Sequence, residues 1–268
     1  MAPPADSALA EAFLSAAIAA AEAIMEVRGR GLSVEHKSDA SPVTEADRAA
    51  EAIILSHLAE IAPGVPVVAE EACAAGPVPS VEATFFLVDP LDGTKEFVRG
   101  GEDFTVNIAL IRDRAPVIGV VLAPATGELF WGIAGEGAWS ARVVEGRIVG
   151  QRPAKVRKAG DRLDVVASKS HRTPETDEYI GRYRVGALVS GGSSLKFCLV
   201  ADGRADLYPR MGTTMQWDTA AGDAVLRAAG GRTVTLDGKP LPYGPNGAPG
   251  LATFQNPWFI AAGAVDLV

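Results

Sequence analysis

The feature of this sequence that most constrains its fold is a series of strand-like segments between residues 65 and 144. Six apolar runs follow one another: VPVVAE, TFFLVDP, FTVNIALIRD, APVIGVVLAP, ELFWGIAG and GAWSARVV. Their spacing and the turn residues between them favour hairpins and a meander over βαβ units, because parallel strands need a long crossover connection.

Helical segments precede and follow this series. The hydrophobic periodicity predicts a helix over residues 7–28 and a second helix that opens at Thr44 and ends before Pro63. Further strands are predicted at 162–170, 183–190, 205–209 and 232–236, and further helices at 174–183, 193–202 and 217–231. Strands grouped with helices on their faces predict a layered α+β fold. The polar segment from about 145 to 162 is interpreted as a linker between an N-terminal half, 1–145, and a C-terminal half, 146–268, of one compact unit.

Composition excludes several classes of protein. The chain has 268 residues, 48% of them hydrophobic, so it can bury a substantial core and is not globally disordered. The formal net charge is −8, whereas nucleic-acid-binding proteins typically carry an excess of basic residues. Cys73, Cys198 and three histidines without a close pair exclude a cysteine-rich zinc module and a zinc-protease motif. We expect a small molecule, not nucleic acid, as the partner; nothing in the sequence indicates an oligomeric state.

The N-terminus carries no targeting signal of the usual kind. The Ala-rich stretch at 16–23 has no Lys or Arg before it and is flanked by Glu11 and Glu22, which is the wrong charge pattern for a signal peptide. No stretch reaches the ~20 apolar residues that cross a bilayer, so no integral membrane segment is expected. These features predict a cytoplasmic protein. Peripheral contact with the inner face of the membrane is the alternative, without support from a lipidation motif or a basic amphipathic segment.

The sequence Asp89-Pro90-Leu91-Asp92-Gly93-Thr94 is the sharpest chemical signal in the chain. It follows the apolar run Phe85–Val88. An ordinary turn at the end of a strand explains the proline and the glycine. It does not explain two carboxylates at the end of a strongly apolar strand, where uncompensated charge is costly.

Other carboxylates also stand at the ends of apolar elements. Glu70 and Glu71 close one strand, and Asp218 opens a helix; taken singly they indicate a solvated loop and an N-cap. Taken together with the first motif, these hard oxygen ligands suit Mg²⁺. The neighbouring cysteine, Cys73, is interpreted as an inert thiol, with redox control of the site as the weaker alternative.

Two further patterns bear on chemistry. Thr44 and Asp47 have the spacing of a helix-capping box, which is at least as good an interpretation as a catalytic one from the residues alone. The backbone N–H groups of Gly93 and Thr94 would favour a phosphate. The chain has no P-loop and no G-x-G-x-x-G motif that opens a helix, which disfavours nucleoside triphosphatases and dinucleotide enzymes.

These motifs resemble the magnesium-dependent, lithium-sensitive phosphatases typified by inositol monophosphatase. The matching segments are SPVTEAD at 41–47, AEE at 69–71, DPLDGTKEF at 89–97 and WDTAAG at 217–222. The resemblance runs from about residue 8 to residue 260. It implies a layered αβαβα sandwich of the inositol monophosphatase and fructose bisphosphatase type, and two to three Mg²⁺ ions.

The resemblance also implies roles for individual residues. Thr94 would orient the attacking water and Asp47 would hydrogen-bond Thr94, so these two and Glu70 are the expected catalytic residues. The amides of Gly93 and Thr94 would hold the phosphate that is cleaved, and Lys37 matches a loop lysine near the metal. The expected metal ligands are the side chains of Glu70, Asp89, Asp92 and Asp218 and the carbonyl group of Leu91.

Within this superfamily, the forms DGTKEF and GSSLKF resemble the bisphosphate nucleotidases. Arg210 stands where the inositol monophosphatases have an acidic residue for sugar hydroxyls, and an arginine suits a second phosphate; a surface ion pair is the alternative. Lys169 is a further candidate contact. The expected substrate-binding residues are Asp92, Gly93, Thr94, Lys95, His171, Ser193, Lys196, Arg210 and Asp218. The alternatives are a surface or helix-start histidine for His171 and N-capping for Ser193 and Ser194.

The expected reaction is hydrolysis of the 3′-phosphate of adenosine 3′,5′-bisphosphate to AMP and phosphate by metal-activated water. The sulfated nucleotide 3′-phosphoadenylyl sulfate is a second expected substrate. An inositol monophosphatase or fructose-1,6-bisphosphatase activity is the nearer alternative. A non-enzymatic scaffold that keeps the fold is the more distant alternative.

Overall fold

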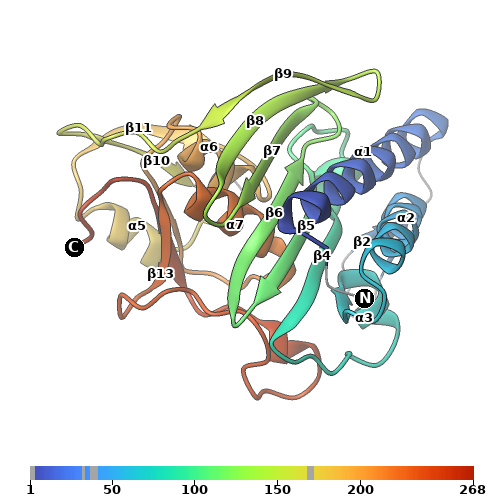
Figure 1. Ribbon diagram of the computed structural model, residues 1–268. Coiled ribbons are helices and arrows are strands. Elements are labelled where there is room, and N and C mark those ends of the chain that lie inside the picture. Colours follow the sequence, from blue (N-terminus) through green and yellow to red (C-terminus); the bar gives the residue numbers. More distant parts are fainter. Residues whose placement is uncertain (1–3, 32–33, 37–41, 168–171) are drawn as a thin grey trace.

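The computed structural model describes residues 4–31, 34–36, 42–167 and 172–268, the strand residues 34–36, 42 and 43 by their backbone alone. Lys37, Lys169 and His171 therefore lie outside the described residues. The described chain forms five layers of helices and sheets that alternate from one side of the molecule to the other (Figure 1).

Two helices make the first layer, as the periodicity predicts. Helix α1 spans Asp6–Arg30 and packs against α2, Glu45–Ile61, and both lie on one face of a seven-stranded sheet (Figure 1). A short antiparallel pair, β1 (Val34–His36) and β2 (Pro42–Thr44), joins them. Edge-on contact between Phe13 and Phe86, with ring centroids 5.6 Å apart, fixes α1 on the sheet.

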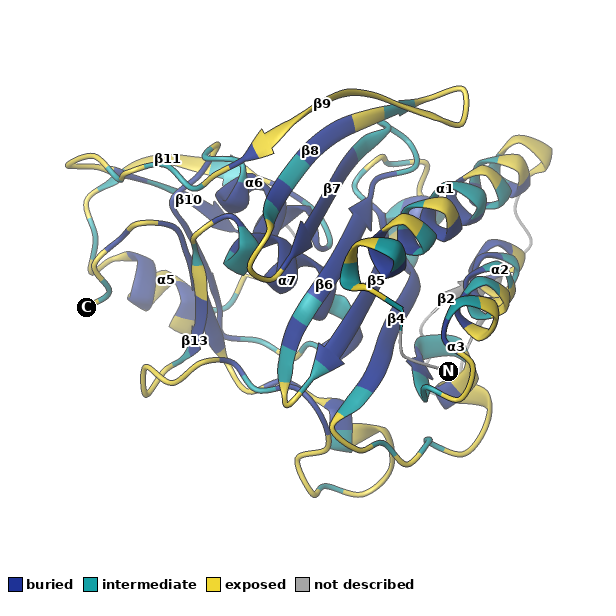
Figure 2. Ribbon diagram, viewed as in Figure 1, coloured by how far each residue is buried: buried dark blue, intermediate teal, exposed yellow. Residues whose placement is uncertain are grey.

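Helix α1 differs from the sequence-based expectation in one respect. Among the described residues it is the one helix long and apolar enough to cross a membrane, by length and composition only. A core helix meets the same criterion, and α1 buries a face from Leu9 to Val27 against α2 and the sheet. Figure 2 shows this buried face along the helix. The burial favours the core-helix interpretation.

The seven-stranded sheet has the order β3-β4-β5-β6-β7-β8-β9. Strands β4 to β9 form the expected antiparallel meander, and β3 pairs with β4 in parallel. The strands are β3 (Val67–Ala69), β4 (Thr84–Asp92), β5 (Thr105–Arg112), β6 (Ala115–Leu122), β7 (Glu128–Ile133), β8 (Gly137–Val144) and β9 (Arg147–Ala154).

Strand β9 corrects the interpretation of residues 145–162 as a linker. Residues Arg147–Ala154 pair with β8 along their length. All of them except Ala154 are exposed, because β9 is the outer edge of the sheet (Figure 2). An exposed edge strand needs no alternation of apolar residues, so its sequence looks like that of a loop.

The third layer consists of α6 (Leu195–Ala201) and α7 (Ala220–Ala228), on the other face of the same sheet. Helix α7 crosses β5, β6 and β7 at close range. A Cβ atom on Gly132 of β7 would lie 2.8 Å from Cα of Val225, so the glycine allows this approach.

The fourth layer is a five-stranded sheet with the order β11-β10-β12-β14-β13. Its strands are β10 (Leu163–Ala167), β11 (Val185–Ser190), β12 (Leu207–Arg210), β13 (Arg232–Thr235) and β14 (Phe259–Ala262). Strand β14, which the sequence analysis missed, lies between β12 and β13. Helix α5 (Pro174–Ile180) covers the outer face as the fifth layer.

Three hydrophobic clusters lie between these layers, and the arrangement confirms the layered αβαβα fold. One lies between α1, α2 and the large sheet, one surrounds α6 and α7, and one lies between the small sheet and α5. The chain leaves the large sheet at Ala154 and enters the small sheet at Leu163. The division into halves at residues 145 and 146 stays a prediction.

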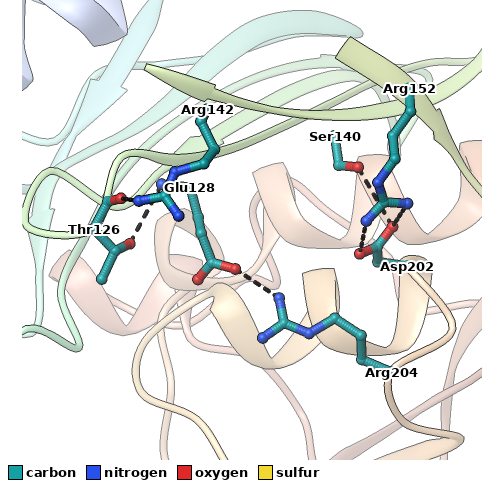
Figure 3. A network of polar contacts seen from close by, with 7 residues as sticks. All are labelled: Thr126, Glu128, Ser140, Arg142, Arg152, Asp202 and Arg204. Carbon is teal, nitrogen blue, oxygen red and sulfur yellow. Dashed lines mark hydrogen bonds and ion pairs between the residues drawn. The ribbon is translucent and has the colours of Figure 1, made fainter. Parts of the chain in front are cut away.

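Polar contacts tie the third layer to the edge of the large sheet (Figure 3). Arg152 of β9 donates two hydrogen bonds, of 2.7 and 2.6 Å, to the carboxylate of Asp202 at the end of α6. Two residues further on, Arg204 donates to Glu128 of β7 at 2.6 Å. These contacts fix the position of α6 relative to the sheet.

Candidate active site

The acidic motif lies where β4 ends. A register shift separates Asp89, which pairs with Asn107 of β5, from Asp92, which pairs with Thr105. Residues directly opposite each other point to the same face of a sheet. Both aspartates therefore face the layer of α6 and α7, on the same side as Phe85 and Leu87.

A tight turn leads from Asp92 into the short helix α4, Thr94–Val98. Gly93 has a φ of +97°, and a Cβ atom there would lie 2.6 Å from Oγ of Ser193. The turn thus requires glycine for its backbone conformation and for the close approach of the loop before α6.

Asp47 connects the first turn of α2 to this motif. Its Oδ2 accepts hydrogen bonds from the amide and the hydroxyl group of Thr44, at 2.8 and 2.7 Å. Its Oδ1 accepts the hydroxyl group of Thr94 at 3.0 Å. The capping box is confirmed, and the same side chain also makes the contact that the family resemblance implies. The catalytic role of this contact stays a prediction.

Asp218 approaches the site from the opposite layer. It ends the 3₁₀ turn η1, Gln216–Asp218, where its Oδ2 accepts the amide of Met215 at 2.8 Å. The N-cap of α7 is Thr219, so the interpretation of Asp218 as the cap of that helix is wrong. Ser194 donates its hydroxyl group to the carbonyl group of Asp218 at 2.5 Å, which ties this turn to the start of α6.

The carboxylates of the motif repel one another. Burial, followed by the charges of Glu70, Asp92 and Asp218, raises the pKa of Asp89 well above its usual value. Burial also raises the pKa of Asp92 to about 6, although Lys196 opposes the shift, and raises the pKa of Asp218, with Asp92 and Glu70 adding to it. Glu70 opens the short helix α3, Glu70–Ala75, at the end of β3.

This donor set fits a hydrated divalent cation. Within the described residues, no three His, Cys, Asp or Glu side chains already stand in the arrangement of a formed metal site. The donors are nevertheless oxygen atoms alone, and a cation would relieve the repulsion that raises their pKa values. Asn107 and Thr105 support the fit: their side-chain polar atoms are buried and make no hydrogen bond within the described chain. Such groups suit water molecules around Mg²⁺, which keeps several of them.

A cavity of about 580 Å³ opens beside the acidic motif. Two carboxylates, Asp92 and Asp218, and two cations, Lys196 and Arg210, line it. The remaining lining residues are Gly93, Lys95, Glu96, Arg99, Asp103, Gly191, Gly192, Ser193, Phe197, Tyr208, Thr213, Thr214 and Thr219.

Both cations come from the interior of the protein. The side chain of Arg210, at the end of β12, is 8% exposed and donates to the carbonyl group of Thr213 at 3.0 Å. A surface ion pair is therefore the wrong interpretation of this arginine. Lys196 of α6 lies with its Nζ 5.5 Å from the ring centroid of Tyr208, and burial lowers its pKa to about 8.

The other expected contacts differ in what the structure shows. Ser193 donates its hydroxyl group to the carbonyl groups of Asp92 and Asp103, at 2.9 and 3.0 Å, and not to the start of α6, so N-capping is wrong for it. Lys95 lies exposed at the rim of the cavity. Cys73 is buried and its thiol pKa is raised to about 11 by burial, which fits the inert interpretation.

Several residues of this site are not predictable from the motifs. Asn107 carried a signal, since it is a polar residue within the apolar run FTVNIALI. Thr213, Thr214 and Arg99 line the cavity from loops and a helix end, where no periodicity marks them.

The fold and the acidic site together define a class of protein. The model of the inositol monophosphatase family matches residues 6–263, and the chain belongs to this family.

Relatives within the family are more specific. The chain is 43% identical over 242 residues to the 3′(2′),5′-bisphosphate nucleotidase CysQ of Escherichia coli (strain K12), which covers 90% of this chain and 94% of that protein. Its similarity to CysQ of Buchnera aphidicola is 39% identity over 212 residues, 79% of this chain and 78% of that one.

Solved structures agree with this placement. The crystal structure of CysQ from Bacteroides thetaiotaomicron superposes with a TM-score of 0.79 at 37% identity, and covers 97% of this chain and 98% of that chain. Inositol monophosphatase from Anabaena superposes with a TM-score of 0.70 at 25% identity, over 97% of this chain and 92% of that one.

Proposed function

We propose that this chain is a Mg²⁺-dependent phosphatase that removes the 3′-phosphate of adenosine 3′,5′-bisphosphate and releases AMP and phosphate. The observation that carries the proposal is a single cavity lined by two carboxylates of the acidic site, Asp92 and Asp218, and by two buried cations, Lys196 and Arg210. The phosphate that is cleaved would thus lie at Asp92 and Asp218, and a second anionic group of the substrate would lie at Lys196 and Arg210. The similarity to nucleotidases supports the same substrate class.

The acidic cluster beside the cavity is the proposed metal site. Glu70, Asp89, Asp92, Asp218 and the carbonyl group of Leu91 would hold two or three Mg²⁺ ions. When bound, they supply a water of lowered pKa and positive charge at the reacting phosphate.

The chain itself positions the water and the phosphate. Thr94 donates its hydroxyl hydrogen to Asp47, so the lone pairs of its oxygen are available to accept a hydrogen bond from the attacking water and orient it. The amides of Gly93 and Thr94 hold the oxygens of the phosphate. Attack then breaks the bond between phosphorus and the 3′-oxygen, and this oxygen leaves with a proton from water. Correct placement alone contributes a large share of such a rate enhancement.

The two cations of the cavity, Lys196 and Arg210, form the proposed site of the 5′-phosphate. Arg210 offers a planar fork of donors, and Lys196 adds a compact charge. Lys95, Ser193 and His171 are proposed as further contacts. An inositol phosphate would place neutral hydroxyl groups against Arg210, which makes it the poorer ligand. We also propose a cytoplasmic location, as for a small-molecule enzyme of this family.

The identity of the product tests this proposal. With Mg²⁺, we expect adenosine 3′,5′-bisphosphate to give 5′-AMP, separated by chromatography from adenosine 3′-phosphate. The Asp89→Asn variant and the protein in excess EDTA should release no phosphate above background. Adenosine 3′-phosphate as the product, or undiminished activity of the variant, would contradict it.

A further inference from the structure

Helix α3 brings Glu70 to the acidic site, yet it has no cap of its own. Its N-cap residue, Ala69, has no side chain that could accept a hydrogen bond. A helix of six residues is marginal by itself, and the N–H groups of its first turn need partners from elsewhere.

A carboxylate of α2 supplies one of these partners. Glu51 Oε2 accepts the backbone N–H of Glu71, the residue after Glu70, at 2.9 Å. Glu51 is 6% exposed and Glu71 is half-buried, so this bond is partly shielded from solvent, between two helices that contact each other.

Glu51 lies one helical turn after Asp47, so both carboxylates project from the same face of α2. Asp47 holds Thr94 at the start of α4, and Glu51 holds the first turn of α3. The two short helices that carry Thr94 and Glu70 are thus fixed to one rigid helix at positions four residues apart.

We infer that Glu51 is a positioning residue, which holds the first turn of α3 so that the carboxylate of Glu70 is directed at the metal site. The inference rests on the proposed function, because it takes Glu70 as a ligand. The backbone N–H of Glu71 would otherwise lose its partner, and the first turn of α3 would fray. Residues that orient metal ligands typically change affinity or activity by about 10- to 100-fold when they are replaced.

Three variants and two measurements test the inference. Glu51→Ala removes the acceptor, Glu51→Gln keeps an acceptor oxygen without the charge, and Glu60→Ala is the control at an exposed position of the same helix. The Mg²⁺ dissociation constant is measured by calorimetry without substrate, and the thermal midpoint is measured in EDTA. We expect Glu51→Ala to weaken Mg²⁺ binding by at least about tenfold, and Glu51→Gln and Glu60→Ala to stay within about threefold of the wild type.

The inference is overturned if folded Glu51→Ala binds Mg²⁺ as the wild type does, even with a lower thermal midpoint, because that pattern marks a purely structural role. It is also overturned if Glu51→Gln loses as much affinity as Glu51→Ala. Should Glu51→Ala not fold, Glu51→Asp, whose shorter side chain cannot reach the N–H of Glu71, takes its place with the same expectation. A wild type that neither binds Mg²⁺ nor releases phosphate would overturn the proposed function and this inference together.

Discussion

At the scale of single residues, we predict that Arg210 determines the choice of substrate, because its charge lines the cavity. Arg210 is 8% exposed and lines the same cavity as Asp92 and Asp218. A charge-assisted contact of this kind contributes about 1.5 to 3 kcal/mol. We expect Arg210→Ala to raise the KM for adenosine 3′,5′-bisphosphate by about 10- to 100-fold, and to leave the KM for a nucleoside 3′-monophosphate within about threefold. Equal increases for both substrates, in steady-state assays at saturating Mg²⁺, would refute this role.

Lys196 gives the site a pH dependence on the alkaline side. Burial lowers its pKa to about 8, while Asp92 acts in the opposite direction. The ammonium group is charged below that pH and neutral above it, so affinity for the second phosphate should fall as pH rises through 8. We expect the KM for the bisphosphate to rise between pH 7 and 9.5 in the wild type. Lys196→Arg keeps its charge over this range and should show no such rise; a flat wild-type profile would count against the assignment.

Residues in contiguous motifs can be predicted from the sequence, whereas residues whose role depends on distant partners cannot. The structure places Asp47 against Thr94, as the resemblance implies, although 47 positions separate them. Glu51 has no local signal, because its partner is a backbone N–H group that only the packing of α2 on α3 brings near. His171 lies outside the described residues, and its role stays a prediction.

At the scale of elements, the buried and exposed ion pairs should contribute differently. Arg227 pairs with Asp223 inside the third layer, where the aspartate is fully buried. Arg30 pairs with Glu26 on the surface of α1, where the two side chains are 66% and 62% exposed. We expect Arg227→Ala to lower the free energy of unfolding by about 3 kcal/mol, and Arg30→Ala by about 1 kcal/mol or less. Urea unfolding measures both; similar losses would show that solvent screening does not separate them.

The contrast between buried and exposed elements also explains which helices and strands can be predicted from the sequence. The meander β4 to β8 and the helices α1 and α2 bury apolar faces, so their periodicity marks them. Strand β9 is polar because it is an exposed edge, and β14 is a short run between two partners. Helices α3 and α4 have six and five residues, too few to show a period.

At the scale of the whole molecule, we expect the acidic site to lower the stability of the fold unless a cation is bound. The pKa of Asp92 is about 6 in the folded chain, chiefly because of burial, and about 4 when unfolded. Between those values the folded state keeps a proton that the unfolded state has lost. The contribution of this group to stability is therefore present at low pH and disappears as pH rises to about 6.

The Asp92→Asn variant tests whether the charge of Asp92 lowers the stability of the fold in the absence of Mg²⁺. In EDTA at pH 7.5 we expect it to be more stable than the wild type by roughly 1 to 3 kcal/mol, with the difference vanishing near pH 4. Saturating Mg²⁺ should reverse the order, because the wild type binds the ion better. Urea unfolding at the two pH values gives the comparison, and equal stabilities at pH 7.5 in EDTA would contradict the account.

The central claim is that one cavity combines an acidic metal site, with Asp92 and Asp218, and two cations, Lys196 and Arg210, that select a substrate with a second phosphate. The most direct measurement is phosphate release with Mg²⁺ from adenosine 3′,5′-bisphosphate, inositol 1-phosphate and fructose 1,6-bisphosphate, each at the same low concentration. We predict a strong preference for the nucleotide, and its loss in Arg210→Ala. Preference for an inositol or sugar phosphate would contradict the substrate assignment and leave the metal site in place, and no release from any of the three would contradict the account as a whole.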